Sequence, residues 1–229
     1  MFMPSAGDKI NATPAQRPQP ITLAGRLVTL VPLEPKVHGD SLYRLTTGVM
    51  NDELWRYLFD GPLTNRTDYY NHLVQKTSSG DAVFFAILNN SSGSAVGYAS
   101  YLNIVPAHRS MEVGNILYSP ILQRTPSATE TMYLMARHAF DDLGYRRYEW
   151  KCNALNEPSR RAALRLGFQF EGIFRQHLII KGANRDSAWY SMLDGEWPTR
   201  KANFERWLSP KNFDSAGKQI MSLSAMNLG

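Results

Sequence analysis

The order of the predicted strands and helices changes once along the chain, and this change restricts the fold more than any other feature of the sequence. Runs rich in β-branched and aromatic residues follow one another at 25–34, 81–105 and 110–119, and the turn cluster Asn-Asn-Ser-Ser-Gly splits the second run. Strands that follow one another through short turns pair antiparallel. The first half of the chain therefore predicts a series of antiparallel strands.

From residue 127 onward, helical and strand patterns alternate. They indicate a helix at about 127–142, a strand at 146–152, a helix at 156–166 and a strand at 168–177. A final hairpin turns within residues 181–186. Because a strand, helix, strand alternation predicts a parallel crossover, we expect a mixed α/β sheet that changes from antiparallel to parallel, with helices on both faces.

The composition predicts one globular domain with a tail at each end. The chain has 229 residues, of which 43% are hydrophobic and 20% charged. Residues 1–20 contain four prolines and few apolar side chains, which is typical of a flexible tail. We therefore place the domain at 21–197, and we expect 198–229 to form a short helix followed by a polar tail.

The net charge of +5 limits the classes of partner. The 25 lysines and arginines are scattered along the chain, whereas a nucleic-acid interface needs a continuous basic stripe. A modest positive excess suits a small polyanion such as a phosphorylated cofactor. No run approaches the roughly 18 apolar residues of a membrane span, and the N-terminus lacks a hydrophobic signal core. We expect no nucleic acid and no membrane as partners.

Cysteine and histidine usage favours a cytoplasmic protein without a metal. The single cysteine, Cys152, excludes an internal disulfide and fits a reducing compartment. It falls near the end of a predicted buried strand, where it is expected to act as a small apolar residue. The five histidines are dispersed without the paired spacing of metal ligands.

The segment Leu122–Glu130 is the first candidate for a binding site. It carries a predicted strand into a predicted helix through polar residues, and unpaired N–H groups at a helix start attract anions. Arg124 adds a positive charge for a phosphate. Ser127 and Glu130 fit a capping box, but Thr125 can also cap the helix, with Pro126 at its first position.

This segment resembles the acyl-CoA pyrophosphate loop of the GNAT N-acetyltransferase superfamily. Gln123 and Ala128 take the first and last positions of the family pattern, whereas Pro126 stands where the family usually has glycine. The residues Ala-Thr-Glu at 128–130 are most similar to those of the RimJ/RimL-like branch, which acetylates amino groups of proteins and small molecules.

Three further motifs support the resemblance, which covers about residues 21–197. Glu112 matches the acidic position on the family's fourth strand. The stretch Asn-Glu-Pro-Ser-Arg-Arg-Ala-Ala-Leu-Arg-Leu-Gly-Phe at 156–168 matches the second signature, and Phe-Glu-Gly follows at 170–172. The resemblance implies a GNAT-like fold in which the fourth and fifth strands, here 111–118 and 146–152, splay apart.

The resemblance also implies acetyl-CoA as co-substrate, with its pantetheine arm between the splayed strands. The cofactor-binding residues implied are Ile116, Tyr118, Gln123, Arg124, Thr125, Ser127, Ala128, Thr129 and Asn156. Of these, Ile116 and Tyr118 would bind the arm through their backbone, and Asn156 would also cap its helix. The loop residues would surround the pyrophosphate.

Direct acetyl transfer to an amine needs a base for the ammonium proton and an acid for the departing thiolate. The resemblance assigns the base to Glu112. Many relatives place a tyrosine acid four residues before the glycine of Gly-Phe, but that position is Ala163 here. Ser159 or an ordered water is then expected to supply the proton.

The acceptor is expected over the N-terminal helical segments, where aromatic and acidic residues suit a cationic amine. The candidates are Trp55, Tyr57 and Asp60. The acceptor is a protein N-terminus or a small-molecule amine, and the enzyme is a monomer or a homodimer. The same composition also suits a helix that only packs on the sheet. A non-catalytic acyl-CoA-binding regulatory protein is the alternative from another functional class.

Overall fold

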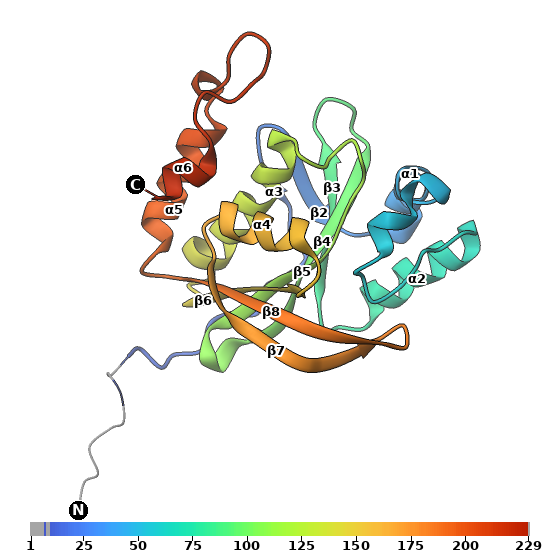
Figure 1. Cartoon of the computed structure of the whole chain (residues 1–229), viewed down its shortest axis with the longest axis horizontal. Coiled ribbons are helices and arrows are strands. Elements are labelled where there is room, and N and C mark those ends of the chain that lie inside the picture. The colour runs from blue at the N-terminus through green and yellow to red at the C-terminus, as the bar shows by residue number, and fades with distance from the viewer. Residues whose placement is uncertain (1–6, 8–9, 229) are drawn as a thin grey trace, which may run out of the picture.

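The computed structural model describes residue 7 and residues 10–228, which form a single mixed sheet covered by helices (Figure 1). The strands are β1 (Leu23–Ala24), β2 (Val28–Pro32), β3 (Val83–Asn89), β4 (Ala95–Val105), β5 (Ser110–Tyr118), β6 (Arg147–Asn153), β7 (Gln169–Ile180) and β8 (Ala183–Leu193). The α-helices are α1 (Pro35–Thr46), α2 (Arg66–Ser78), α3 (Pro126–Arg137), α4 (Glu157–Arg165), α5 (Trp197–Leu208) and α6 (Leu223–Leu228). Short helical turns are η1 (Val49–Trp55), η2 (Pro106–His108), η3 (His138–Asp142) and η4 (Pro210–Asn212).

The sheet confirms the predicted change from antiparallel to parallel pairing. Its order is β1-β2-β3-β4-β5-β6-β8-β7, and each of the first four strands pairs antiparallel with the next. The helix α3 then crosses over, so β5 and β6 pair parallel. The alternation does not continue into a second parallel pair, because β7 forms an antiparallel hairpin with β8 at the edge of the sheet.

Helices cover both faces of the sheet, as predicted (Figure 1). On one face, α3, α4, α5 and α6 pack with the strands in a large core that includes Met135, Ala163, Trp207 and Leu223. On the other face, α1, η1 and α2 build a smaller core around Leu42, Trp55 and Tyr69. We call these the α3 face and the α2 face of the sheet.

The strand β5 contains a bulge that changes which side chains meet each face. Ser100 of β4 pairs with Gly114, but Tyr98 pairs with Leu117, so β5 carries one extra residue between these pairs. Asn115 lies within the bulge at a φ of 50°. Before the bulge Val113 faces the α3 core, and after it Ile116 packs against the same core.

The two central strands separate directly beside this bulge. The parallel ladder between β5 and β6 ends at the pair Val113 and Trp150. Beyond it, β5 still pairs with β4 as far as Tyr118, and β6 still pairs with β8 as far as Asn153. The expected splay is therefore present, and the backbone of residues 114–118 that faces β6 is outside any ladder in the described part of the chain.

Both ends of the described chain are attached to the domain. The Ala15 N–H donates to the Pro106 carbonyl at 3.0 Å, and Arg17 donates to the Gly80 carbonyl at 2.6 Å. A flexible tail therefore does not describe residues 11–18, while residues 1–6 and 8–9 of that prediction lie outside the described residues. The prediction of a polar C-terminal tail is also wrong. Leu223 and Met226 are buried in the core on the α3 face.

Candidate active site

The helix α3 begins at the segment that the sequence marks as an anion site. Thr125 is the N-cap, and its hydroxyl accepts from the Ala128 N–H at 3.3 Å, with Pro126 at the first helical position. Thr125 also donates to the Leu122 carbonyl at 2.6 Å, which fixes the turn before the helix. The Ser127 N–H has no hydrogen-bond partner among the described residues. The helix thus presents a free donor where an anion would bind.

The predicted capping box of Ser127 and Glu130 is wrong, because Glu130 points into the sheet instead. Its carboxylate accepts the backbone N–H groups of Arg26, Leu27 and Val28 at 3.2, 2.6 and 2.9 Å. Gly25 leaves the space for this contact, since a Cβ atom there would lie 2.6 Å from the Glu130 Oε2. The buried carboxylate ties the first turn of α3 to the hairpin between β1 and β2.

The loop before α3 leaves its charged residue free. Gln123 donates through Nε2 to the Tyr118 carbonyl at 3.2 Å, so its side chain folds back on the end of β5. Arg124 is exposed in the left-handed region at a φ of 60°, and its guanidinium has no partner among the residues that the structure describes. The structure therefore brings an unpaired cation beside the free N–H of the helix start.

The remaining cofactor candidates lie along the splay and at the start of α3. Ile116 and Tyr118 are partly buried against the core on the α3 face, and the Tyr118 hydroxyl donates to the Ala128 carbonyl at 3.4 Å. Thr129 is buried, and Arg165 of α4 donates to its hydroxyl at 3.1 Å. Thr129 is thus engaged inside the fold and is positioned to hold α4 against α3 rather than to meet an anion.

The helix α4 lies at the other side of the splay. Asn156 is its N-cap and accepts from the Ser159 N–H at 3.2 Å, as expected for a capping residue. The Ser159 hydroxyl accepts from the Trp150 Nε1 at 3.0 Å. Cys152 lies near this hydroxyl, and burial raises the pKa of its thiol. Ser159 therefore sits at the α3 face of β6, at the level where the ladder ends.

Glu112 lies on the opposite face of the sheet from Ser159. It is 5% exposed, and its Oε2 accepts from the Asn103 Nδ2 at 2.6 Å and pairs with the Lys151 Nζ at 3.0 Å. The Oε1 atom has no hydrogen-bond partner among the described residues. Burial raises the pKa of the Glu112 carboxyl, and the nearby Lys151 and Asn103 partly offset that rise.

Lys151 belongs to a row of alternating charges that the sequence analysis missed. Arg147, Glu149 and Lys151 lie at every second position of β6, so their side chains share the α2 face. Lys151 contacts Glu149 at 2.8 Å and lies 3.8 Å from the centroid of the Trp189 ring, and Arg147 bridges Glu149 and Glu171. The signal that points to this row is the period-2 pattern Arg-x-Glu-x-Lys in a predicted strand.

The three predicted acceptor residues are not brought together. Trp55 is completely buried, and its Nε1 donates to the Thr46 carbonyl at 2.7 Å, so it is part of the core and has no surface for a substrate. Tyr57 is half-buried and donates from its hydroxyl to the Leu155 carbonyl at 3.1 Å, which links η1 to the turn before α4. Only Asp60 reaches an open pocket.

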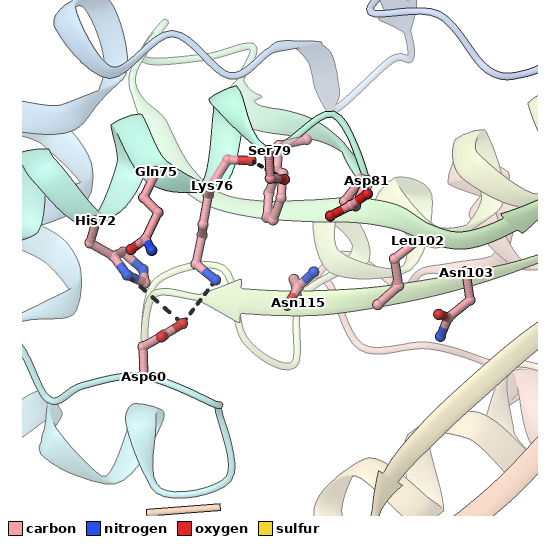
Figure 2. Close-up of a pocket in the computed structure, with 11 residues that line it drawn as sticks. Asp60, His72, Gln75, Lys76, Ser79, Asp81, Leu102, Asn103 and Asn115 are labelled. Atoms are coloured by element: carbon pink, nitrogen blue, oxygen red, sulfur yellow. Dashed lines mark hydrogen bonds and ion pairs between the residues drawn. The ribbon is translucent and has the colours of Figure 1, made fainter.

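This pocket has a volume of about 350 Å³ and lies between α2 and the strands β4 and β5 (Figure 2). Asp60 contacts Lys76 at 2.9 Å and His72 at 3.8 Å across it. Burial and the neighbouring Lys76 lower the pKa of His72 to about 4, so this histidine is neutral at pH 7. Asn103 lines the pocket and also donates to Glu112, so the pocket adjoins the candidate base.

In residue 7 and residues 10–228, no group of three or more His, Cys, Asp or Glu side chains is arranged to hold a metal ion. Across the same residues, no helix combines the length and the apolar character that crossing a membrane requires.

Comparison with known proteins gives consistent matches. The family described as Acetyltransferase (GNAT) domain matches residues 28–169. A GCN5-related N-acetyltransferase from Brucella melitensis is 43% identical, with 95% of this chain and 98% of that chain covered and a TM-score of 0.93. The protein named "Putative ribosomal N-acetyltransferase YdaF" of Bacillus subtilis is 29% identical over 109 residues, which cover 48% of this chain and 59% of that protein.

A third match shows the fold alone. The Microcin C7 self immunity acetyltransferase MccE, solved in complex with acetyl-CoA and AMP, is 21% identical with a TM-score of 0.64, over 74% of this chain and 93% of that one. The chain spans only 59% and 55% of the length of the two curated relatives that it matches. The matched family model spans the whole splay and the start of α3. The chain therefore belongs to the acetyltransferase (GNAT) domain family.

Proposed function

We propose that the protein is an N-acetyltransferase that moves the acetyl group of acetyl-CoA directly to a primary amine. One observation carries this proposal. The splay beyond Val113 and Trp150 opens between a helix start with a free N–H on the α3 face and a buried carboxylate on the α2 face. Direct transfer requires the cofactor and the amine to meet, and the splay has groups suited to the cofactor on its α3 face and to the amine on its α2 face.

The residues on the α3 face fit the cofactor. The free Ser127 N–H and the exposed Arg124 guanidinium suit a pyrophosphate, because backbone donors at a helix start and a cation act together on an anion. The backbone of residues 114–118 does not pair with β6, so its N–H and C=O groups on that side suit an amide-containing arm, which needs such partners. Acetyl-CoA would supply the acetyl thioester, and Asn156 would stand beside the arm at the start of α4.

Glu112 would remove the proton from the attacking amine. Its Oε1 is free while Asn103 and Lys151 hold Oε2, so one oxygen is fixed and the other is available to a substrate. A carboxyl whose pKa is raised is a stronger base once ionised, which favours proton removal near neutral pH. Ser159 would protonate the leaving thiolate from the α3 face, so the two protons move on opposite sides of the sheet.

The relatives support the amine as acceptor. YdaF is named as a ribosomal N-acetyltransferase, and that name agrees with a RimJ/RimL-like protein that acts on peptide amines. The complex of MccE with acetyl-CoA shows the cofactor bound by a protein of the same fold. The pocket at Asp60 is the proposed entrance for the amine, since it adjoins Asn103 and holds a carboxylate that attracts cations.

A melting experiment followed by a transfer assay tests the proposal. Acetyl-CoA at about 100 times its dissociation constant should stabilise the protein by about 2.7 kcal/mol, which raises the melting temperature. Release of free CoA should then depend on an added amine. No melting shift at millimolar acetyl-CoA would overturn cofactor binding. A shift without CoA release across a broad panel of amines and peptides would support the regulatory alternative instead.

A further inference from the structure

Arg185 of β8 is a buried cation without a counterion. The residue is 7% exposed, and its Nε is enclosed without a hydrogen-bond partner. No hydrogen bond or ion pair joins the Arg185 side chain to any group of residue 7 or residues 10–228, although its backbone belongs to the ladder with β7. The guanidinium lies over the Phe59 ring, whose centroid is 5.0 Å from the Arg185 Cζ.

The two buried carboxylates of the described residues, Glu112 and Glu130, are both paired. Glu112 has Asn103 and Lys151, and Glu130 has three backbone N–H groups. A buried charge without a partner is unfavourable, so proteins pair such groups or fill the site with a ligand. Burial accordingly lowers the pKa of the Arg185 guanidinium. The missing partner of Arg185 therefore marks a place where an anion would be stabilised.

This place lies beside the open end of the splay. Asn153, the last residue of β6, pairs with Ser187, and the Ala154 N–H donates to the Asp186 carbonyl at 2.8 Å. Alternation along β8 puts Arg185 on the same face as Trp189, which contacts Lys151. Glu112 of β5, across the splay, is near enough to act electrostatically on Arg185.

A second unpaired donor lies on the same face. The Trp189 Nε1 is buried and has no hydrogen-bond partner in the described residues. Lys151 cannot fill the role of anion binder, because two carboxylates already occupy its ammonium group. The face that holds the candidate base thus offers one free guanidinium and one free indole N–H, and both are donors.

We propose that the acceptor of the transfer carries a carboxylate in the same molecule as its amine, and that Arg185 binds this carboxylate. The inference rests on the proposed acetyltransferase function and names its substrate class. A guanidinium presents two parallel N–H groups that match the two oxygens of a carboxylate. A fixed cation also disfavours the protonated form of a nearby amine, so it helps to keep the amine nucleophilic. The carboxylate belongs to a free amino acid or to an acidic residue beside a peptide N-terminus.

Matched pairs of acceptors test this proposal and separate the two sources. One pair is L-alanine and L-alaninamide, and the other is the dipeptide amides Ala-Asp-NH₂ and Ala-Asn-NH₂. In each pair the amino group stays in place and a carboxamide replaces the carboxylate. The parent enzyme should prefer the acid of one pair by about tenfold or more in kcat/KM, and the pair that discriminates identifies the source. No preference in either pair would overturn the proposal.

Two arginine variants assign the preference to a residue. Arg185→Met should reduce the preference of the acid over its neutral partner to about one. Arg206→Met changes an exposed arginine of α5 in the same way and should leave the ratio as in the parent. A preference that survives in Arg185→Met would show that another group binds the carboxylate.

Thermal melting gives a measurement that does not need turnover. Arg185→Met should melt at the temperature of the parent or above it, because an unpaired buried cation is removed. A fall of several degrees would show a structural role and overturn the proposal. The acid should raise the melting temperature of the parent and not that of Arg185→Met. This result can be obtained even when no amine is acetylated, so a failure of the proposed function is distinguishable from a failure of this inference.

Discussion

The two faces of the splay carry different kinds of binding groups. On the α3 face, the groups that would meet the cofactor are backbone N–H groups, small hydroxyls and one exposed arginine. On the α2 face, the groups that would meet the amine are charged side chains: Glu112 and Arg185 are buried, and Lys151 is partly buried. The first face is held by local turns of the chain, whereas the second depends on contacts between distant strands.

This difference determines how selective each face is for its ligand. A helix start offers its N–H groups to any phosphate, so this face suits a cofactor that many proteins share. Buried charges are selective, because a ligand that fails to match them leaves a desolvated charge unpaired. We therefore expect substitutions on the α2 face to change the reaction strongly and substitutions on the α3 face to change binding moderately.

Glu112→Gln should produce the largest effect. Loss of a general base lowers turnover by roughly 10²- to 10⁴-fold, while the affinity for acetyl-CoA on the other face should stay unchanged. Turnover and calorimetric binding measured on the same preparation check both statements. An equal loss in cofactor affinity would show that the two faces are not separate.

Lys151→Met should produce the next largest effect. Removal of one partner from a buried ion pair costs about 3–5 kcal/mol of folding stability. Lys151 lowers the pKa of Glu112, so its loss should raise that pKa further, and the acidic limb of the pH–rate profile should move to higher pH.

The matched control for Lys151→Met is Lys201→Met on α5. Lys201 pairs with Asp141 at 2.7 Å at the surface, and such pairs contribute about 0–1 kcal/mol. The control should leave the pH–rate profile in place. An unmoved profile in Lys151→Met would mean that Lys151 serves stability alone.

Arg124→Ala should weaken acetyl-CoA binding by more than about tenfold, which is 1.4 kcal/mol. The loss should be greatest at low salt, because Arg124 is exposed and its interaction with a phosphate is screened. Pro126→Gly on the same loop should change the affinity by less than about tenfold, since one more N–H and one more flexible residue act in opposite directions. Calorimetric titration at two salt concentrations measures both variants, and an unchanged Arg124→Ala would contradict a phosphate site here.

Thr125→Ala should give the smallest effect, a loss of about 1 kcal/mol in folding stability, because it removes the N-cap of α3. Ser127→Ala should change stability by less than about 0.5 kcal/mol, since the Ser127 side chain caps nothing. Urea unfolding compares the two. The reverse order would favour Ser127 as the cap.

The sequence predicted the change from antiparallel to parallel pairing and the approximate starts of α3 and α4. Strand alternation, turn clusters and the capping residues Thr125 and Asn156 are local signals, and local signals survive in a single sequence. The choice between Thr125 and Ser127 needed the structure, because both residues satisfy the same local rule. The position of Glu130 was misjudged because its partners lie about a hundred residues earlier in the chain.

The α2 face was predicted less well for the same reason. The ion pair of Glu112 with Lys151 depends on the register between β5 and β6, where Glu112 pairs with Glu149. Trp55 was placed in the acceptor site because of its residue type, but the packing of η1 against α2 buries it beside Tyr69. Arg185 carried no local signal, since its distinguishing property is the absence of a partner in three dimensions.

The contact between Glu130 and the hairpin at residues 25–28 has a consequence for the evolution of the chain. Glu130 needs the space above Gly25, and the three N–H groups need its carboxylate. A side chain at position 25 would displace Glu130 and leave these groups without an acceptor. Positions 25 and 130 should therefore covary among relatives that keep this hairpin: glycine should accompany glutamate, and a larger residue at 25 should accompany a shorter residue at 130. An alignment in which the two positions vary independently would show that the hairpin has another way to satisfy its amides.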